Sequence, residues 1–230
     1  MELKGRLKLI ADMTPKCDIV CDIGTDHAYI PIYLVKNGKC KKAVAADVKS
    51  GPLKAAQKNI DSFGLRDYII AKIGDGLSPI EEDEADVIVI AGMGGMLIRE
   101  ILESNYSKAV KANALILQPM NAIELVREWL YEHGFEVYSE RLVSEGHKIY
   151  NAIAAKWTGV IQKKDEVFYY IGQKLIENRD PLLKKYIEKK ISQLDKIIYE
   201  MESMKNKDIE LRTNYIKIRN DLIGILKGDL

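Results

Sequence analysis

The chain has 230 residues, of which 47% are hydrophobic and 30% charged, and its formal net charge at pH 7 is +1. This composition excludes an intrinsically disordered chain. The length suits one α/β domain with a small additional segment. Because the net charge is near zero, any nucleic-acid partner must be met by a local basic face rather than by bulk charge. No apolar run approaches the roughly 20 residues that span a bilayer, and the first residues lack a secretory leader, so we expect a cytoplasmic protein with no membrane contact.

Short apolar runs alternate with amphipathic segments over the first two thirds of the chain. Strands are predicted at residues 18–23, 42–47, 68–73, 85–91 and 114–117. Helices are predicted from Leu3 to just before Pro15 and at residues 28–35, 50–63 and 122–133, with Ser50 as an N-cap and Gly134 at a C′ position. This alternation predicts a parallel, doubly wound sheet.

Two further apolar runs, at residues 135–142 and 148–157, face each other across Ser144–Gly146. They predict an antiparallel hairpin rather than another strand–helix unit. A parallel sheet that is closed by such a hairpin is typical of class I methyltransferases. We therefore predict an α/β fold, a class I Rossmann-like methyltransferase sheet, for residues 1–160.

The pattern changes after Thr158, where no strand signal remains. Apolar residues then step by four and three in two runs, Ile187, Ile191, Leu194, Ile198, Met201 and Leu211, Tyr215, Ile218, Leu222, Ile225. A turn is predicted between the runs at Asn206–Asp208. Such seams predict a C-terminal antiparallel helical (coiled-coil) hairpin, which we assign to a second domain at residues 161–230.

Acidic residues gather where the predicted parallel strands end. Doubly wound folds bind ligands at the carboxyl ends of their strands, which meet at one edge of the sheet. The residues at these ends include four aspartates and two glycines, namely Asp22, Asp26, Asp47, Asp75, Gly24 and Gly92. A single strand-end aspartate is more often a helix cap or a turn former. Four of them at successive ends favour a binding site.

The turn after the first strand points to the class of cofactor. It reads Asp22-Ile-Gly-Thr-Asp26, so Asp26 stands where the second glycine of a GxGxxG turn would be. A pyrophosphate held there would meet a carboxylate, which disfavours a dinucleotide and an NAD-dependent dehydrogenase. A phosphate-free cofactor with a cationic centre suits the turn better, and S-adenosylmethionine has both properties. Asp47 lies where an acidic side chain takes ribose hydroxyls, and Asp75 can accept from an adenine amino group.

Four segments, DIGTDHAYIP, AADVKSGPL, GDGL and VIVIAGMGG, resemble in order and spacing the bacterial tRNA (adenine22-N1)-methyltransferases, the TrmK family. That family has a Rossmann-like domain followed by a helical, coiled-coil domain, and the resemblance covers essentially the whole chain. It implies methyl transfer from S-adenosylmethionine to N1 of adenine 22 in tRNA. The Asn-Pro-Pro-Tyr motif of N6-adenine enzymes is absent after the fourth strand, where Ala91-Gly-Met-Gly94 stands. Its absence is consistent with a ring-nitrogen target.

Site residues follow from these strand ends and from the resemblance. The candidate cofactor-binding residues are Asp22, Gly24, Asp47, Val48, Asp75, Gly76, Ala91, Gly92 and Met93. The candidate catalytic residues are Asp26, His27 and Tyr29, and the candidate substrate-binding residues are Gly94, Gln118, Asn121 and Arg6. We expect Asp26 to stabilise the cationic adenine ring that methylation produces. His27 is the rival for acid–base work, or it orients the glycine turn.

The predicted partner is tRNA, and we expect no metal and a monomer or weak dimer. The tail either clamps tRNA or dimerises the protein. The three cysteines, Cys17, Cys21 and Cys40, fit neither a CxxC pair nor a zinc knuckle and are expected to be small core residues. Two alternatives stay open: an S-adenosylmethionine-dependent methyltransferase of a small molecule or protein, and a non-enzymatic RNA-binding protein with a decayed cofactor site.

Overall fold

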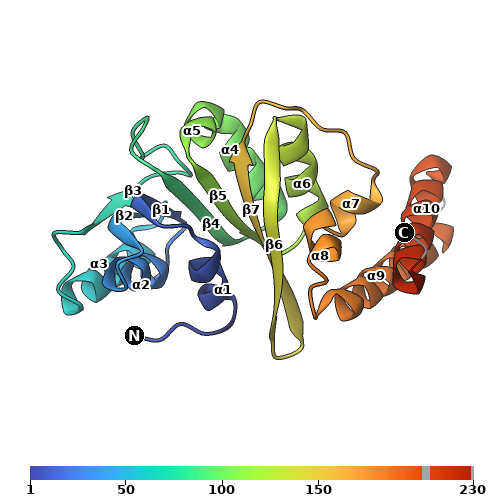
Figure 1. Ribbon diagram of the computed structural model, residues 1–230, viewed down its shortest axis with the longest axis horizontal. Coiled ribbons are helices and arrows are strands. Elements are labelled where there is room, and N and C mark those ends of the chain that lie inside the picture. The colour runs from blue at the N-terminus through green and yellow to red at the C-terminus, as the bar shows by residue number, and fades with distance from the viewer. Residues whose placement is uncertain (204–207, 229–230) are drawn as a thin grey trace. The chain divides into compact units, whose positions relative to one another are not determined.

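A computed structural model describes residues 1–203 and 208–228 (Figure 1). The chain divides into two compact units, Met1–Lys163 and Lys164–Leu230, whereas the boundary proposed from the sequence lies at residue 160. None of the described helices is long and apolar enough to cross a membrane.

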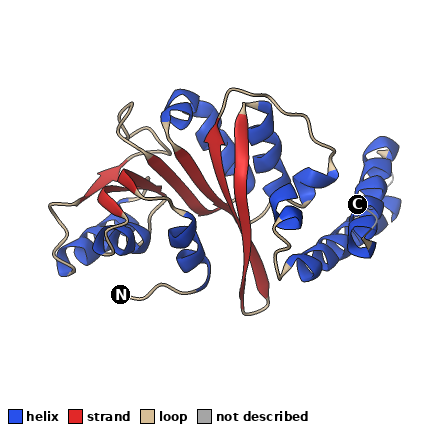
Figure 2. Cartoon of the chain, viewed as in Figure 1, coloured by secondary structure: helices blue, strands red, loops and turns tan. Residues whose placement is uncertain are grey.

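The first unit is built on a seven-stranded sheet in the order β3-β2-β1-β4-β5-β7-β6 (Figure 2). The strands are β1 (Cys17–Ile23), β2 (Cys40–Asp47), β3 (Ile69–Ile73), β4 (Val87–Met93), β5 (Ala114–Pro119), β6 (Phe135–Glu145) and β7 (Lys148–Trp157). The first five are parallel, and β7 pairs antiparallel with both β5 and β6. The predicted parallel sheet closed by a hairpin is confirmed.

Helices cover both faces of this sheet (Figure 1). They are α1 (Gly5–Met13), α2 (Tyr29–Lys36) and α3 (Ser50–Ser62) on one face and α4 (Gly95–Ser104), α5 (Tyr106–Lys111) and α6 (Ile123–Glu132) on the other. With both faces covered, the central strands are continuously apolar: Val87–Ile90 of β4 and Ala114–Leu117 of β5 are buried throughout. The core therefore lies on both sides of β1, β4 and β5.

Two local features differ from the sequence-based expectation. Ser50 is the first residue of α3 rather than its cap; Lys49 holds the N-cap position, and its side chain makes no capping bond. The prediction of a Ser50 cap is wrong because the chain turns one residue earlier, where the Lys49 amide donates to Asp47 Oδ1 at 2.6 Å. Helices α4 and α5 were not predicted, since the glycines at positions 94 and 95 masked the start of a helical pattern.

The second unit is helical in its described residues. It contains α7 (Val167–Tyr170), α8 (Gln173–Glu177), α9 (Leu183–Ser203) and α10 (Ile209–Lys227). Ion pairs join Arg212 to Glu202 and Arg219 to Asp195, so the start of α10 lies beside the end of α9 and the two helices run antiparallel. The predicted helical hairpin is confirmed. Its turn at Asn206–Lys207 lies outside the described residues.

The seam between α9 and α10 follows the apolar pattern of the sequence. Ile187, Leu194, Ile218 and Leu222 are at most 2% exposed. Leu211 departs from the pattern, with 42% of its surface exposed. Asp208 caps α10 by accepting from the Leu211 amide at 2.9 Å.

A buried ion pair joins α6 to the β6–β7 hairpin. Arg127 Nε donates to Glu140 Oε1 at 2.8 Å, and Arg127 Nη2 donates to Asn151 Oδ1 at 2.9 Å. All three side chains have no solvent exposure. Removal of one partner from such a pair leaves the other charge buried without compensation, which is far more costly than the loss of a surface pair.

We predict that Glu140→Ala lowers the free energy of unfolding by about 3–5 kcal/mol, because the Arg127 guanidinium stays buried without its carboxylate. The matched control is Glu136→Ala on the same strand, which removes an exposed pair with Lys156. That control should cost less than about 1 kcal/mol. Urea unfolding followed by circular dichroism measures both, and equal costs for the two variants would refute the burial argument.

Candidate active site

A cavity of about 380 Å³ opens at the carboxyl end of β1. This is the switch point of the sheet, because β1 has β2 on one side and β4 on the other. Eight residues proposed from the sequence line it together, namely Arg6, Asp22, Gly24, Asp26, His27, Tyr29, Ala91 and Gly92. Three residues that were not proposed, Leu7, Thr25 and Ile30, complete the lining.

The turn after β1 is held against the end of β2. The amides of Gly24 and Thr25 both donate to the Ala46 carbonyl, at 2.8 and 3.0 Å. Gly24 has φ +76°, a left-handed conformation in which a side chain is strained. The turn thereby keeps its backbone in the lining of the cavity.

Asp22 is the last acidic residue inside β1 and is only 5% exposed. Burial raises the pKa of its carboxyl to about 7, a hydrogen bond from Thr25 opposes this rise, and the neighbouring Asp47 charge adds to it. The carboxyl group is therefore poised to change charge near neutral pH. Thr25 thus affects the charge of Asp22 and lines the cavity, although it was not among the residues proposed from the sequence. Its position directly after Gly24 could have indicated this role.

Asp26, His27 and Tyr29 form the rim of the cavity. His27 Nε2 lies 3.3 Å from Asp26 Oδ2. The His27 and Tyr29 rings are stacked, with centroids 5.1 Å apart and an interplanar angle of 21°. Tyr29 is 40% exposed, so this aromatic pair presents a face that a planar group can reach.

Arg6 reaches the cavity from α1. Its Nη1 donates to Gln118 Oε1 at 3.3 Å, and its backbone amide donates to Glu145 Oε1 at 2.6 Å. Gln118 is fully buried, and its Nε2 donates to the Pro119 carbonyl at 3.0 Å. The Gln118 amide is therefore engaged at both ends and supports Arg6.

Close backbone packing joins the turns that follow β4 and β5. A Cβ at Gly95 would stand 2.2 Å from the Ala122 carbonyl oxygen, so only glycine fits there. The Gly95 amide donates to the Asn121 carbonyl at 3.1 Å and also meets Asn121 Oδ1 at 3.3 Å. Asn121 thus holds the start of α4, next to Gly94.

The remaining proposed residues lie at or just after the ends of β2, β3, β4 and β5, outside the lining of this cavity. They are Asp47, Val48, Asp75, Gly76, Met93, Gly94, Gln118 and Asn121. Asp47 is close enough to Asp22 to raise the pKa of that carboxyl, and Val48 is 58% exposed beside it. The cavity therefore brings together the proposed residues of β1 and its turn with Arg6, Ala91 and Gly92, and the other proposed residues lie outside its lining.

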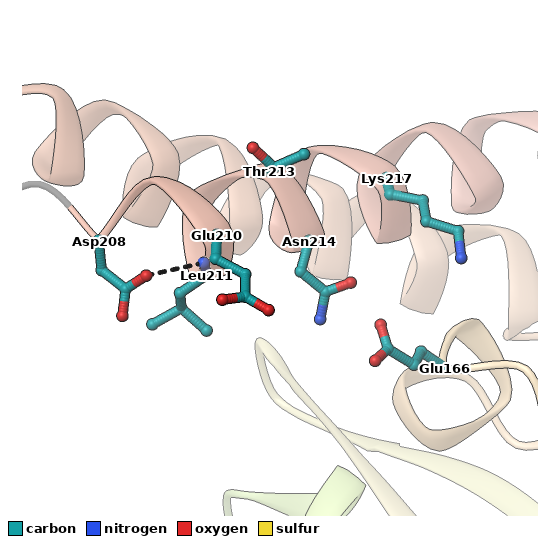
Figure 3. Close-up of a pocket in the computed structure, with 7 residues that line it drawn as sticks. All are labelled: Glu166, Asp208, Glu210, Leu211, Thr213, Asn214 and Lys217. Carbon is teal, nitrogen blue, oxygen red and sulfur yellow. Dashed lines mark hydrogen bonds between the residues drawn. The ribbon is translucent and has the colours of Figure 1, made fainter.

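A larger hollow, of about 610 Å³, lies within the helical unit (Figure 3). Its charged residues are three acids, Glu166, Asp208 and Glu210, and one lysine, Lys217. Asp208 is already engaged as the cap of α10 (Figure 3). The excess of carboxylates makes this hollow a poor match for phosphates. Among the described residues, no group of three or more His, Cys, Asp or Glu side chains could hold a metal ion.

Comparisons with known proteins agree with this arrangement. The model of a methyltransferase domain family matches residues 3–153. The tRNA (adenine(22)-N(1))-methyltransferase of Bacillus subtilis is 39% identical over 156 residues, a match that covers 68% of this chain and 66% of that protein.

Two solved structures extend the likeness to the helical unit. The Bacillus subtilis m1A22 tRNA methyltransferase TrmK has a TM-score of 0.83 and 31% identity, over 99% of this chain and 98% of its own. The TrmK of M. capricolum, solved with S-adenosylhomocysteine, has a TM-score of 0.80 and 30% identity, over 99% and 98%.

The raised pKa of Asp22 predicts a specific dependence of stability on pH. The pKa is about 7 in the folded chain and about 3.9 in an unfolded one, so between these values the folded state binds more protons. The contribution of Asp22 to stability is therefore full below pH 4 and is lost as the pH rises to 7, by roughly 4 kcal/mol. Asp22→Asn should remove this dependence. Urea unfolding of both proteins at several pH values checks it, and parallel pH profiles would contradict it.

Proposed function

We propose that this chain, which belongs to the family of bacterial tRNA (adenine22-N1)-methyltransferases, transfers the methyl group of S-adenosylmethionine to N1 of adenine 22 in tRNA. The observation that carries the proposal is the cavity at the end of β1, which combines carboxylates and a guanidinium beside an exposed aromatic pair. Because its proposed substrate is tRNA, we expect the protein to act in the cytoplasm.

The charges of the cavity suit the methionine end of S-adenosylmethionine. That end is a zwitterion, with an ammonium and a carboxylate on one carbon. The lining holds two carboxylates, Asp22 and Asp26, and the Arg6 guanidinium; we assign the buried Asp22 to the ammonium and Arg6 to the carboxylate of the cofactor. A phosphate placed there would meet both carboxylates, whereas a zwitterion satisfies both signs of charge. We therefore assign Arg6 to the cofactor carboxylate rather than to the tRNA contact first expected for it.

The strand ends beyond the cavity suit the nucleoside end of the cofactor. Asp47 is the last residue of β2, where a carboxylate takes ribose hydroxyls, and the exposed Val48 beside it offers an apolar surface to the adenine ring. Asp75 and Gly76 follow β3, where the carboxylate can accept from the adenine amino group.

The rim suits the target base. An adenine in folded tRNA must leave its stack before its ring nitrogen can be reached, and aromatic side chains hold such extruded bases. The stacked His27–Tyr29 pair lies at the mouth of the cavity beside Asp26. S-adenosylmethionine supplies an activated methyl group, so the chain's main task is to place N1 in line with it. Asp26 then stabilises the positive charge that develops on the ring.

The direct test is methyl transfer from radiolabelled S-adenosylmethionine to unmodified tRNA transcripts, with the product nucleoside identified by mass spectrometry. We expect N1-methyladenosine, and we expect none in a transcript whose adenine 22 is replaced. Transfer to a different position, or no transfer by a protein that binds the cofactor, would refute the proposed substrate.

We predict that Asp26→Ala lowers kcat by about 100-fold, because the product cation loses its nearest carboxylate. Binding of S-adenosylhomocysteine, measured by calorimetry, should change only a few-fold. An unchanged kcat in the radiolabelled methyl-transfer assay with tRNA would show that Asp26 takes no part in the reaction.

Arg6→Met should weaken S-adenosylhomocysteine binding by about 10- to 100-fold, since a charge-assisted hydrogen bond to the carboxylate is lost. Binding of 5′-methylthioadenosine, which lacks the amino-acid end, should stay within about 2-fold. Lys8→Met is the matched control, because Lys8 is an exposed cation on the same helix that pairs with Asp12. Calorimetry measures all three proteins. An equal loss for both ligands, or for neither, would contradict the assignment.

A further inference from the structure

Two cysteines meet at the end of the sheet opposite the active site. Cys17 begins β1 and Cys40 begins β2, and the two residues are directly paired across these parallel strands. Their sulfur atoms lie 2.8 Å apart, and both are free thiols. Neighbouring strands are about 4.8 Å apart, which falls within the Cα separations that a disulfide bridges.

The environment of the pair favours oxidation. Cys17 lines a surface cavity of about 440 Å³ together with Lys16, Asp86 and Tyr138, so a small oxidant can reach it. Cys40 lies behind it and is 3% exposed. The hydrogen bond from Cys17 lowers the pKa of the Cys40 thiol, burial opposes this change, and the charge of Lys39 adds to the lowering. The same hydrogen bond, together with burial, raises the pKa of the Cys17 thiol, so Cys40 is the more acidic of the two. An oxidant can reach the pair through Cys17, and the sulfur of Cys40 lies within contact of it to resolve an oxidised sulfur.

The third cysteine behaves differently. Cys21 lies on β1 roughly 13 Å from Cys17, by the rise per residue of a strand. It has no solvent exposure, and burial raises the pKa of its thiol to about 12. Cys21 is therefore an inert core residue, as the sequence analysis expected of all three cysteines.

We propose that Cys17 and Cys40 form a modification site at which hydrogen peroxide converts the two thiols into an intramolecular disulfide. In the first step a thiolate attacks the peroxide, an S–O bond forms, the O–O bond breaks, and the leaving hydroxide takes a proton and departs as water. In the second step the other sulfur attacks the sulfenic sulfur, the S–S bond forms, and the S–O bond breaks with loss of a second water. Two electrons pass from the sulfurs to the peroxide.

The cross-link closes a loop from residue 17 to residue 40 that contains the Gly24 turn and α2. It joins the amino ends of the strands, roughly 16 Å along β1 from Asp22. Its effect is therefore to restrict the unfolded chain rather than to block the cavity. This should raise the Tm by roughly 5–10 °C.

The test treats the reduced full chain with hydrogen peroxide and counts free thiols after denaturation. We expect the three thiols of the chain to fall to one, with a mass loss of two hydrogen atoms and a fragment spectrum that links Cys17 to Cys40. Dithiothreitol should reverse the change and the rise in Tm.

Two cysteine variants distinguish the proposed Cys17–Cys40 cross-link from oxidation at other thiols. Cys21→Ala should cross-link like the parent chain, whereas Cys17→Ser should retain two free thiols or gain oxygen atoms without a cross-link. Three free thiols in the oxidised parent chain, a cross-link through Cys21, or oxidation of Cys17 to a sulfinic acid alone would overturn the proposal.

Discussion

The backbone bonds that hold the turn after β1 against the end of β2 are the constraint on which the site depends. The Gly24 and Thr25 amides both donate to the Ala46 carbonyl, so the turn cannot move away from β2 without breaking two hydrogen bonds. This places the Asp22 carboxyl under the turn, where burial raises its pKa to about 7, and it directs Asp26, His27 and Tyr29 to the rim. The parallel sheet brings the ends of β2, β3 and β4 to the same edge.

Opposite charges within this small cavity explain the choice of cofactor. Asp22 is buried, and both this burial and the neighbouring Asp47 charge raise the pKa of its carboxyl. A ligand ammonium would favour its charged form, and the Arg6 guanidinium would meet the ligand carboxylate. Arg6 is held for this task by the hairpin, through Glu145, and by the buried Gln118. The hairpin that closes the sheet thus also holds one wall of the proposed cofactor site.

Much of this could be predicted from the sequence, because parallel strands and their ends have strong signals. Continuous apolar runs marked β1, β2, β4 and β5, and the aspartates at the ends of β1, β2 and β3 marked the site edge. Contacts between distant segments left no such signal. The bond between Arg6 and Gln118 joins residues 112 positions apart, and the pairing of Cys17 with Cys40 depends on the register of two strands. Thr25 looked like an ordinary turn residue, and its hydrogen bond to Asp22 emerged only from the fold.

The central claim is that Asp22 and Arg6 receive the zwitterionic end of the cofactor. Calorimetric titration of the chain with S-adenosylhomocysteine at pH 7, in buffers of different ionisation enthalpy, tests it most directly. The raised pKa leaves Asp22 partly protonated before binding, and an ammonium beside it would expel that proton. We expect release of about half a proton per ligand, and none in Asp22→Asn. Tight binding without proton release in the parent chain would contradict the account.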